Sequence, residues 1–98
     1  MNAFFDDLSA RWVAAAGRRG ARIAAPELDA KVAFELLELA RVAAHTQERR
    51  FAPLSCYLAG VAAERLRSAG GPVEAETVAA YINEVRQELE ATTRSEPE

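Results

Sequence analysis

Apolar residues recur every three or four positions through most of this chain, and glycine or proline divides the repeats into four segments. This spacing gathers the apolar side chains on one face of a helix, and the chain contains no alternating pattern typical of β-strands. We therefore expect an all-α fold, a four-helix bundle-like single domain with short loops. The expected helices are Asn2–Gly17, Pro26–His45, Pro53–Ala69 and a fourth helix from Pro72 to about Ala91. Residues 1–91 are expected to form the helical domain, and residues 92–98, which include no apolar residue, a flexible C-terminal tail.

Local signals support these boundaries. Asn2 can cap the first helix, and Pro26 suits a first turn, where its missing N–H is not needed. The third expected helix has apolar residues on two sides, which favours the central position in the bundle. Gly60 lies in its middle, where glycine costs about 1 kcal/mol relative to alanine. A close helix crossing would explain this glycine, and Gly60→Leu is then expected to unfold or loosen the domain.

The composition predicts a thin core. A chain of 98 residues suits one domain, but twenty-two of its residues are alanine and only seven are aromatic. A buried alanine contributes much less transfer free energy than the roughly 1.5–3 kcal/mol of a leucine or phenylalanine. Self-association would compensate for this deficit, so a homodimer is one expected arrangement.

Charge and hydropathy exclude several classes of protein. A net charge of −3 disfavours binding to nucleic acid and to an anionic membrane surface. The longest uncharged run, Phe51–Ala63, contains a proline and is shorter than the ~20 apolar residues of a membrane span. The N-terminal residues do not resemble a signal peptide, and the single cysteine fits a reducing compartment. We expect a cytoplasmic protein that binds neither nucleic acid nor membrane.

The segment Leu37–Gly60 contains the only histidine and the only cysteine, on either side of a charged corner at Thr46–Arg50. One interpretation of the helix face that ends at His45 is structural, with a neighbouring helix covering part of it and His45 stabilised at the negative end of its own helix. The other is a partner-binding patch, because mixed aromatic and arginine surfaces are typical of interfaces. The candidate partner-binding residues, which lie on this face and in the corner, are Phe34, Glu38, Arg41, His45, Glu48 and Arg49.

An anion site is the alternative at the same corner. Arg49 and Arg50 would hold a phosphate or nucleotide group, joined by Arg18, Arg19 and Arg22 if the two arginine-rich corners meet in space. The chain has no glycine-rich phosphate loop, since no Lys-Ser or Lys-Thr follows Gly70-Gly71-Pro72.

Catalytic and metal-binding patterns are not recognisable in this sequence. One histidine and one cysteine eleven residues apart do not make a metal site. Cys56 lies on a small-residue face and is expected to fill the core. We therefore expect a protein that is not an enzyme and has no cofactor, no catalytic residue and no metal ligand.

The corner and its flanking helices resemble a known family, a small all-helical bacterial domain of unknown function (family 6457 of that class). The resemblance rests on a series of short motifs: Leu39-Ala40-Arg41, Ala44-His45, Glu48-Arg49, Ala52-Pro53-Leu54, Tyr57-Leu58 and Gly60. Trp12 also resembles the tryptophan near the start of that domain. This chain departs from the pattern at Thr46, where the family usually has glycine, and at Arg50, where it usually has proline.

Members of that family occur alone or fused to molybdenum-cofactor guanylyltransferase-like domains, which implies an accessory role around cofactor maturation. The sequence and the resemblance together predict a non-catalytic interaction module that docks to a protein partner, such as a nucleotidyltransferase of molybdenum-cofactor metabolism. The alternative is a small anion- or nucleotide-binding domain at Arg49 and Arg50. A DNA-binding regulator is disfavoured because no helix is basic enough to read a groove.

Overall fold

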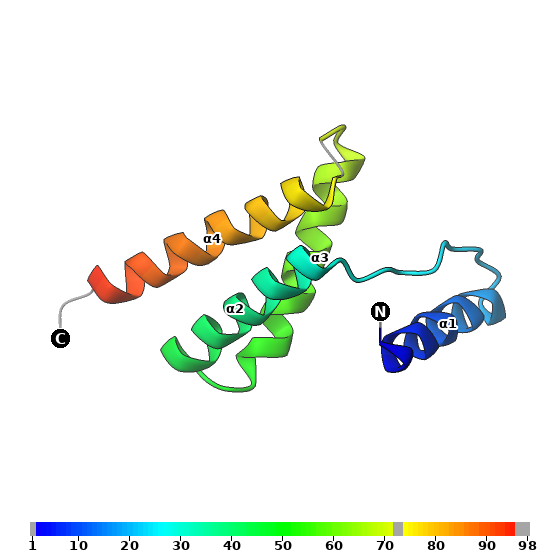
Figure 1. The fold of residues 1–98 in the computed structure, drawn as a ribbon, viewed down its shortest axis with the longest axis horizontal. Coiled ribbons are helices and arrows are strands. Elements are labelled where there is room, and N and C mark those ends of the chain that lie inside the picture. Colours follow the sequence, from blue (N-terminus) through cyan, green and yellow to red (C-terminus); the bar gives the residue numbers. More distant parts are fainter. Residues whose placement is uncertain (1, 72–73, 96–98) are drawn as a thin grey trace.

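The computed structural model describes residues 2–71 and 74–95. It contains four helices, and no strand occurs within these ranges (Figure 1). The helices are α1 (Ala3–Arg18), α2 (Ala30–Thr46), α3 (Phe51–Ser68) and α4 (Ala75–Ser95). The expected all-α class and the four helices are confirmed.

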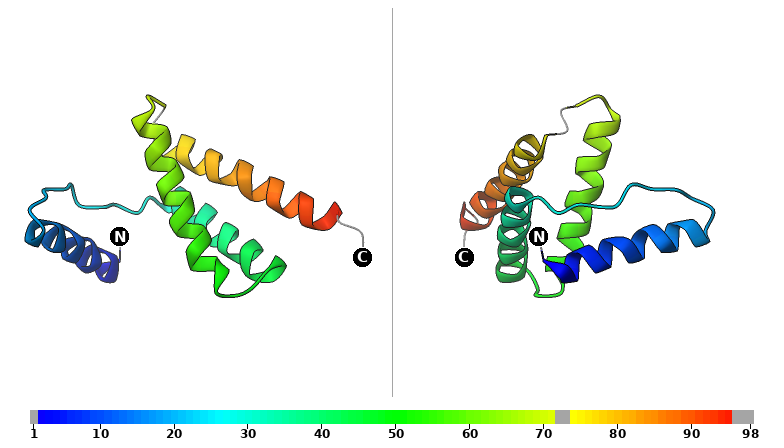
Figure 2. Two further views of the ribbon diagram at one scale, coloured as in Figure 1. Left: turned by 180° about the vertical axis from the view of Figure 1, so that it is seen from behind. Right: turned by 45° about the vertical axis from the view of Figure 1, so that its right-hand side comes forward.

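The bundle-like packing involves α2, α3 and α4, with α2 at the centre. Helix α2 packs against both α3 and α4, whereas α3 and α4 barely touch and diverge from the turn that joins them (Figures 1 and 2). The expectation that the third helix is central is therefore wrong. Cys56 of α3 faces α2, where its thiol contacts the carbonyl oxygen of Leu36, while Leu54 and Tyr57 remain exposed.

Helix α1 lies apart from the rest. It contacts none of the other helices in the described part of the chain, and an extended segment, residues 21–29, connects it to α2 (Figure 2). The hydroxyl of Ser9 donates a hydrogen bond of 2.6 Å to the carbonyl oxygen of Pro26. The connection therefore folds back along α1, and it is longer than the short loop that the sequence predicts.

The start of α2 differs from the prediction for a local reason. Asp29 caps this helix, because its Oδ2 accepts hydrogen bonds from the backbone N–H of Lys31 at 2.8 Å and of Val32 at 3.2 Å. An aspartate N-cap satisfies N–H groups that have no partner within the helix, so the helix begins after Asp29 and Pro26 belongs to the extended segment. At α1 the predicted cap is confirmed, with Asn2 Oδ1 accepting from Phe4 N at 2.7 Å.

Two other helix ends are also shifted. Helix α3 begins at Phe51, which places Pro53 in its first turn, where a proline lacks no helical hydrogen bond. Helix α4 continues to Ser95, past the expected end at Ala91. Pro72 and residues 96–98 of the expected tail lie outside the described residues.

The core is as thin as the composition predicts. The buried apolar residues within the described ranges are Leu39, Val42 and Ala43 from α2 and Ala79 and Ile82 from α4. Neither α1 nor α3 contributes a buried residue. The buried part of the core is therefore supplied by α2 and α4.

A half-buried polar layer crosses the same contact. The side chains of Glu35 and Arg86 are only 14% and 15% exposed, and their charged groups lie 3.7 Å apart. Asn83 Nδ2 donates to both oxygens of Glu35, at 3.2 and 3.3 Å, and Arg86 pairs with Glu90 at 3.2 Å. Arg86 is thus covered by α2, although charged residues surround it in the sequence of α4.

The structure also overturns the reason proposed for Gly60. A Cβ built on Gly60 meets no atom within 4 Å, so no helix crosses there. Gly60→Ala is therefore expected to raise the free energy of unfolding by about 0.5–1 kcal/mol, because alanine is the better helix former. Gly71→Ala is the matched control, since its Cβ would lie 2.9 Å from the backbone oxygen of Leu66 and should destabilise the turn. Urea unfolding of both variants tests this difference, and a loss of stability at Gly60 would contradict it.

Candidate partner-binding surface

One side of α2 is covered by neither α3 nor α4. It carries Phe34, Leu37, Glu38, Arg41 and His45, which we call the outer face of α2. The side chains of Phe34 and Leu37 are 59% and 70% exposed. Leu39 lies two residues beyond Leu37, about 200° around the helix, and it is buried in the core. The outer face is thus opposite the side of α2 that packs in the core.

Charged groups on the outer face are partly paired. Arg41 donates to Glu38 Oε1 from Nη2 at 3.0 Å and lies 3.7 Å from a carboxylate oxygen of Glu90 on α4. The hydrogen bond to Glu38, together with the charge of that carboxylate, raises the pKa of Arg41 above its ordinary value. Helix α4 therefore touches one edge of this face, as the structural interpretation of the sequence expected, and leaves the rest open.

His45 occupies the last turn of α2 and is exposed. A histidine at this position is stabilised, when it is protonated, by the negative end of the helix dipole. Its imidazole makes no ion pair with any described residue, so a partner can approach it directly.

The corner between α2 and α3 is exposed as well. Glu48, Arg49 and Arg50 all face solvent. Arg50 Nε donates to Glu48 Oε1 at 2.8 Å, whereas Arg49 makes no ion pair within the part of the chain that the structure describes. Arg49 is thus the unpaired cation closest in sequence to His45.

Thr46 stabilises the end of α2 at this corner. Its hydroxyl donates a 2.7 Å hydrogen bond to the carbonyl oxygen of Val42. Within residues 2–71 and 74–95, only Gly20 and Gly70 have a positive φ, so the corner needs no left-handed residue. Threonine and arginine are therefore compatible with the turn at Thr46 and Arg50.

Four of the predicted partner-binding residues, Phe34, Glu38, Arg41 and His45, follow the outer face of α2. The other two, Glu48 and Arg49, lie in the exposed corner after the C-terminal end of this helix. Leu37 shares this face but is not among the residues that the sequence predicted for it. Its spacing of three residues from Phe34 and four from Arg41 was the signal that it shares their face.

The two groups of arginines that the anion-site alternative requires do not lie near each other. Arg18 and Arg19 lie at the end of α1, and every view places that end far from the α2–α3 corner (Figures 1 and 2). Arg50 is already neutralised by Glu48. The corner therefore offers an anion one unpaired guanidinium, that of Arg49.

Cys56 belongs to the contact between α2 and α3. Its thiol donates to the carbonyl oxygen of Leu36 at 3.6 Å, and partial burial raises the pKa of this thiol. A thiol with a raised pKa stays protonated near neutral pH and is a weak nucleophile. The geometry agrees with a packing role.

Two further properties hold over residues 2–71 and 74–95. No three His, Cys, Asp or Glu side chains there are grouped so that they could bind a metal ion. None of the helices is both long and apolar enough to span a bilayer.

The fold and the exposed side of α2 define a small all-α domain with an open helix face. The family model for the domain of unknown function DUF6457 matches residues 6–97, so this chain belongs to that family. The match extends from the first turn of α1 through α4, well beyond the corner motifs. No curated protein and no solved structure matches the chain significantly.

Proposed function

We propose that this protein is a non-catalytic interaction module that docks to a partner protein through the outer face of α2. The observation that carries this proposal is the exposure of Phe34 and Leu37 beside Arg41 and His45. Large apolar side chains next to arginine form the energetic centre of many interfaces. The core of this domain is small, so burial of two such large apolar side chains would stabilise it. Their exposure to water therefore supports a role in binding.

The charges indicate the chemistry of the partner. His45 and Arg49 stand at one end of the outer face without ion pairs among the described residues. A complementary partner surface has an apolar hollow for Phe34 and Leu37, with carboxylates near His45 and Arg49. On the basis of the family resemblance, we propose a nucleotidyltransferase of molybdenum-cofactor metabolism as this partner.

Binding of the full chain to a purified molybdenum-cofactor guanylyltransferase, measured by titration calorimetry, tests the proposal. Phe34→Ala is expected to weaken the affinity by about 10- to 30-fold, since truncation of a central interface residue costs about 1.4–2 kcal/mol. The melting temperature should stay nearly constant, because Phe34 is not part of the core. Tyr57→Ala is the matched control, an exposed aromatic residue on the far side of α3.

Equal affinities for Phe34→Ala, Tyr57→Ala and the unchanged chain would remove the outer face of α2 as the docking site. Absence of binding to the enzyme would remove this partner. The anion-binding alternative has less support, because only Arg49 is unpaired at the corner. A melting temperature that rises with phosphate or nucleotide, and that stops rising in Arg49→Ala, would favour that alternative.

A further inference from the structure

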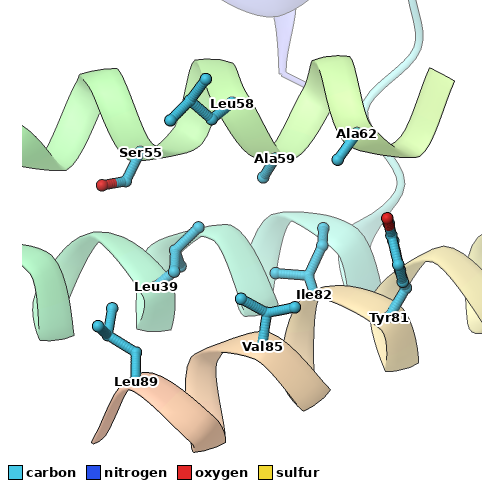
Figure 3. Close-up of a pocket in the computed structure, with 9 residues that line it drawn as sticks. All are labelled: Leu39, Ser55, Leu58, Ala59, Ala62, Tyr81, Ile82, Val85 and Leu89. Carbon is cyan, nitrogen blue, oxygen red and sulfur yellow. The ribbon is translucent and has the colours of Figure 1, made fainter. Parts of the chain in front are cut away.

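An open apolar groove lies on the opposite side of the molecule from the outer face of α2. Its floor is Leu39, and its two walls are α3 and α4, which diverge from each other (Figure 3). Leu58 and Ala62 project from α3, and Val85 and Leu89 project from α4, toward the same space. The groove has a volume of about 290 Å³. Nothing in the described chain fills it.

Helix α1 has the complementary feature, an apolar face without a helix against it. Phe4, Leu8 and Trp12 recur at four-residue intervals on this face, and Phe4 and Trp12 are 64% and 59% exposed. Residues 25–28 of the extended segment lie beside α1, around an open hollow that Leu8 and Trp12 also line. No residue of α1 is buried.

The two surfaces match in spacing. Tyr81, Val85 and Leu89 line the α4 wall of the groove at the same four-residue interval and over the same length as Phe4, Leu8 and Trp12 on α1. Rows of side chains four residues apart form the ridges and grooves by which helices most often pack together. Helix α1 therefore has the right length and side-chain row to lie between α3 and α4.

The total surface area shows that this chain exposes more surface than a compact chain of the same mass. The chain exposes 7517 Å², whereas a compact chain of 10.6 kDa exposes about 5,500 Å². Its radius of gyration is 15.3 Å, against about 12.6 Å for a compact chain of this length. The excess is about 2,000 Å² per chain, or about 4,000 Å² for two chains, which lies in the range of 2,000–5,000 Å² that permanent interfaces bury in total.

The connection to α2 holds α1 apart from the other helices. Asp29 fixes the first turn of α2, and the Ser9–Pro26 hydrogen bond holds the extended segment against α1. Helix α1 thereby lies apart from α3 and α4, which form the walls of the groove (Figure 2). Exchange of an identical element between two chains gives a closed, symmetric dimer in which both uncovered surfaces disappear.

We infer that α1 of a second copy of this chain occupies the groove between α3 and α4, so that the protein is a dimer with exchanged N-terminal helices. This inference does not depend on the proposed function, because the groove and the outer face of α2 lie on opposite sides of α2. It also explains why neither α1 nor α3 has a buried residue in a single chain.

Light scattering after gel filtration of the full chain gives the first test, with an expected mass of twice 10.6 kDa. Leu58→Glu and Trp12→Glu should each convert the dimer to monomer, because each places a charge in the same contact. Leu58 is exposed in a single chain, so α2–α4 should remain folded by circular dichroism. Tyr57→Glu, which changes the residue next to Leu58 but lies outside the groove, should remain dimeric.

Crosslinking separates exchange from closure within one chain. In a Cys56→Ala background, the substitutions Leu8→Cys and Val85→Cys introduce two thiols, which a short bismaleimide can join. The products are analysed on a denaturing gel. Exchange gives a covalent dimer, and Leu58→Glu should abolish it. A crosslinked monomer, a wild-type chain of monomer mass, or a dimer that does not crosslink at these positions would each overturn the inference.

Discussion

Glu35→Ala is expected to lower the free energy of unfolding by about 3 kcal/mol, because it leaves the guanidinium of Arg86 half buried without its partner on α2. The Nε atom of Arg86 is already buried without a hydrogen bond. After the substitution, Glu90 would be the remaining carboxylate beside Arg86, and Asn83 would lose an acceptor. Urea unfolding at one fixed protein concentration measures the loss.

Two control variants show whether burial causes this effect. Glu38→Ala removes a carboxylate that pairs with the exposed side chain of Arg41. This substitution should lower the free energy of unfolding by less than about 1 kcal/mol. Replacing Glu35 and Arg86 together by leucine should recover most of the stability, because no unpaired charge then remains in the contact. If Glu35→Ala costs no more than Glu38→Ala, the polar layer between α2 and α4 does not stabilise the fold.

Ile82→Ala is expected to cost about 3–4 kcal/mol, since it removes a large side chain from a core and leaves a cavity. Ile82 is 5% exposed and is one of only five buried apolar residues that the structure describes. Loss of such a side chain removes much of the total stability of a small domain, which is typically about 5–15 kcal/mol. The variant should unfold at a clearly lower temperature and a lower urea concentration.

Leu37→Ala is the matched control for this second prediction. It also removes a large aliphatic side chain, but from the exposed outer face of α2. Surface substitutions of this kind usually change stability by less than about 0.5 kcal/mol. Equal losses at Ile82 and Leu37 would contradict the assignment of the core to the α2–α4 contact.

The candidate site was largely predictable because its residues lie close together in sequence. Phe34, Arg41 and His45 share a face at intervals that the pitch of a helix dictates, and the structure leaves that face open. Leu37 was not predictable in the same way. An apolar residue at the edge of the apolar side of a helix can face the core or solvent, and only the positions of α3 and α4 decide which.

The sequence by itself determined the all-α class, the four helices, the Asn2 cap and the thin core, because hydrophobic periodicity, capping and composition are properties of short segments. Only the tertiary structure decided that α2 is central, that Gly60 meets no helix and that Arg86 and Glu90 lie under α2. It also decided that α1 stands apart from α2, α3 and α4. The physical reason is that the sequence of an amphipathic helix determines how much apolar surface must be covered, but it does not determine which neighbouring element covers that surface.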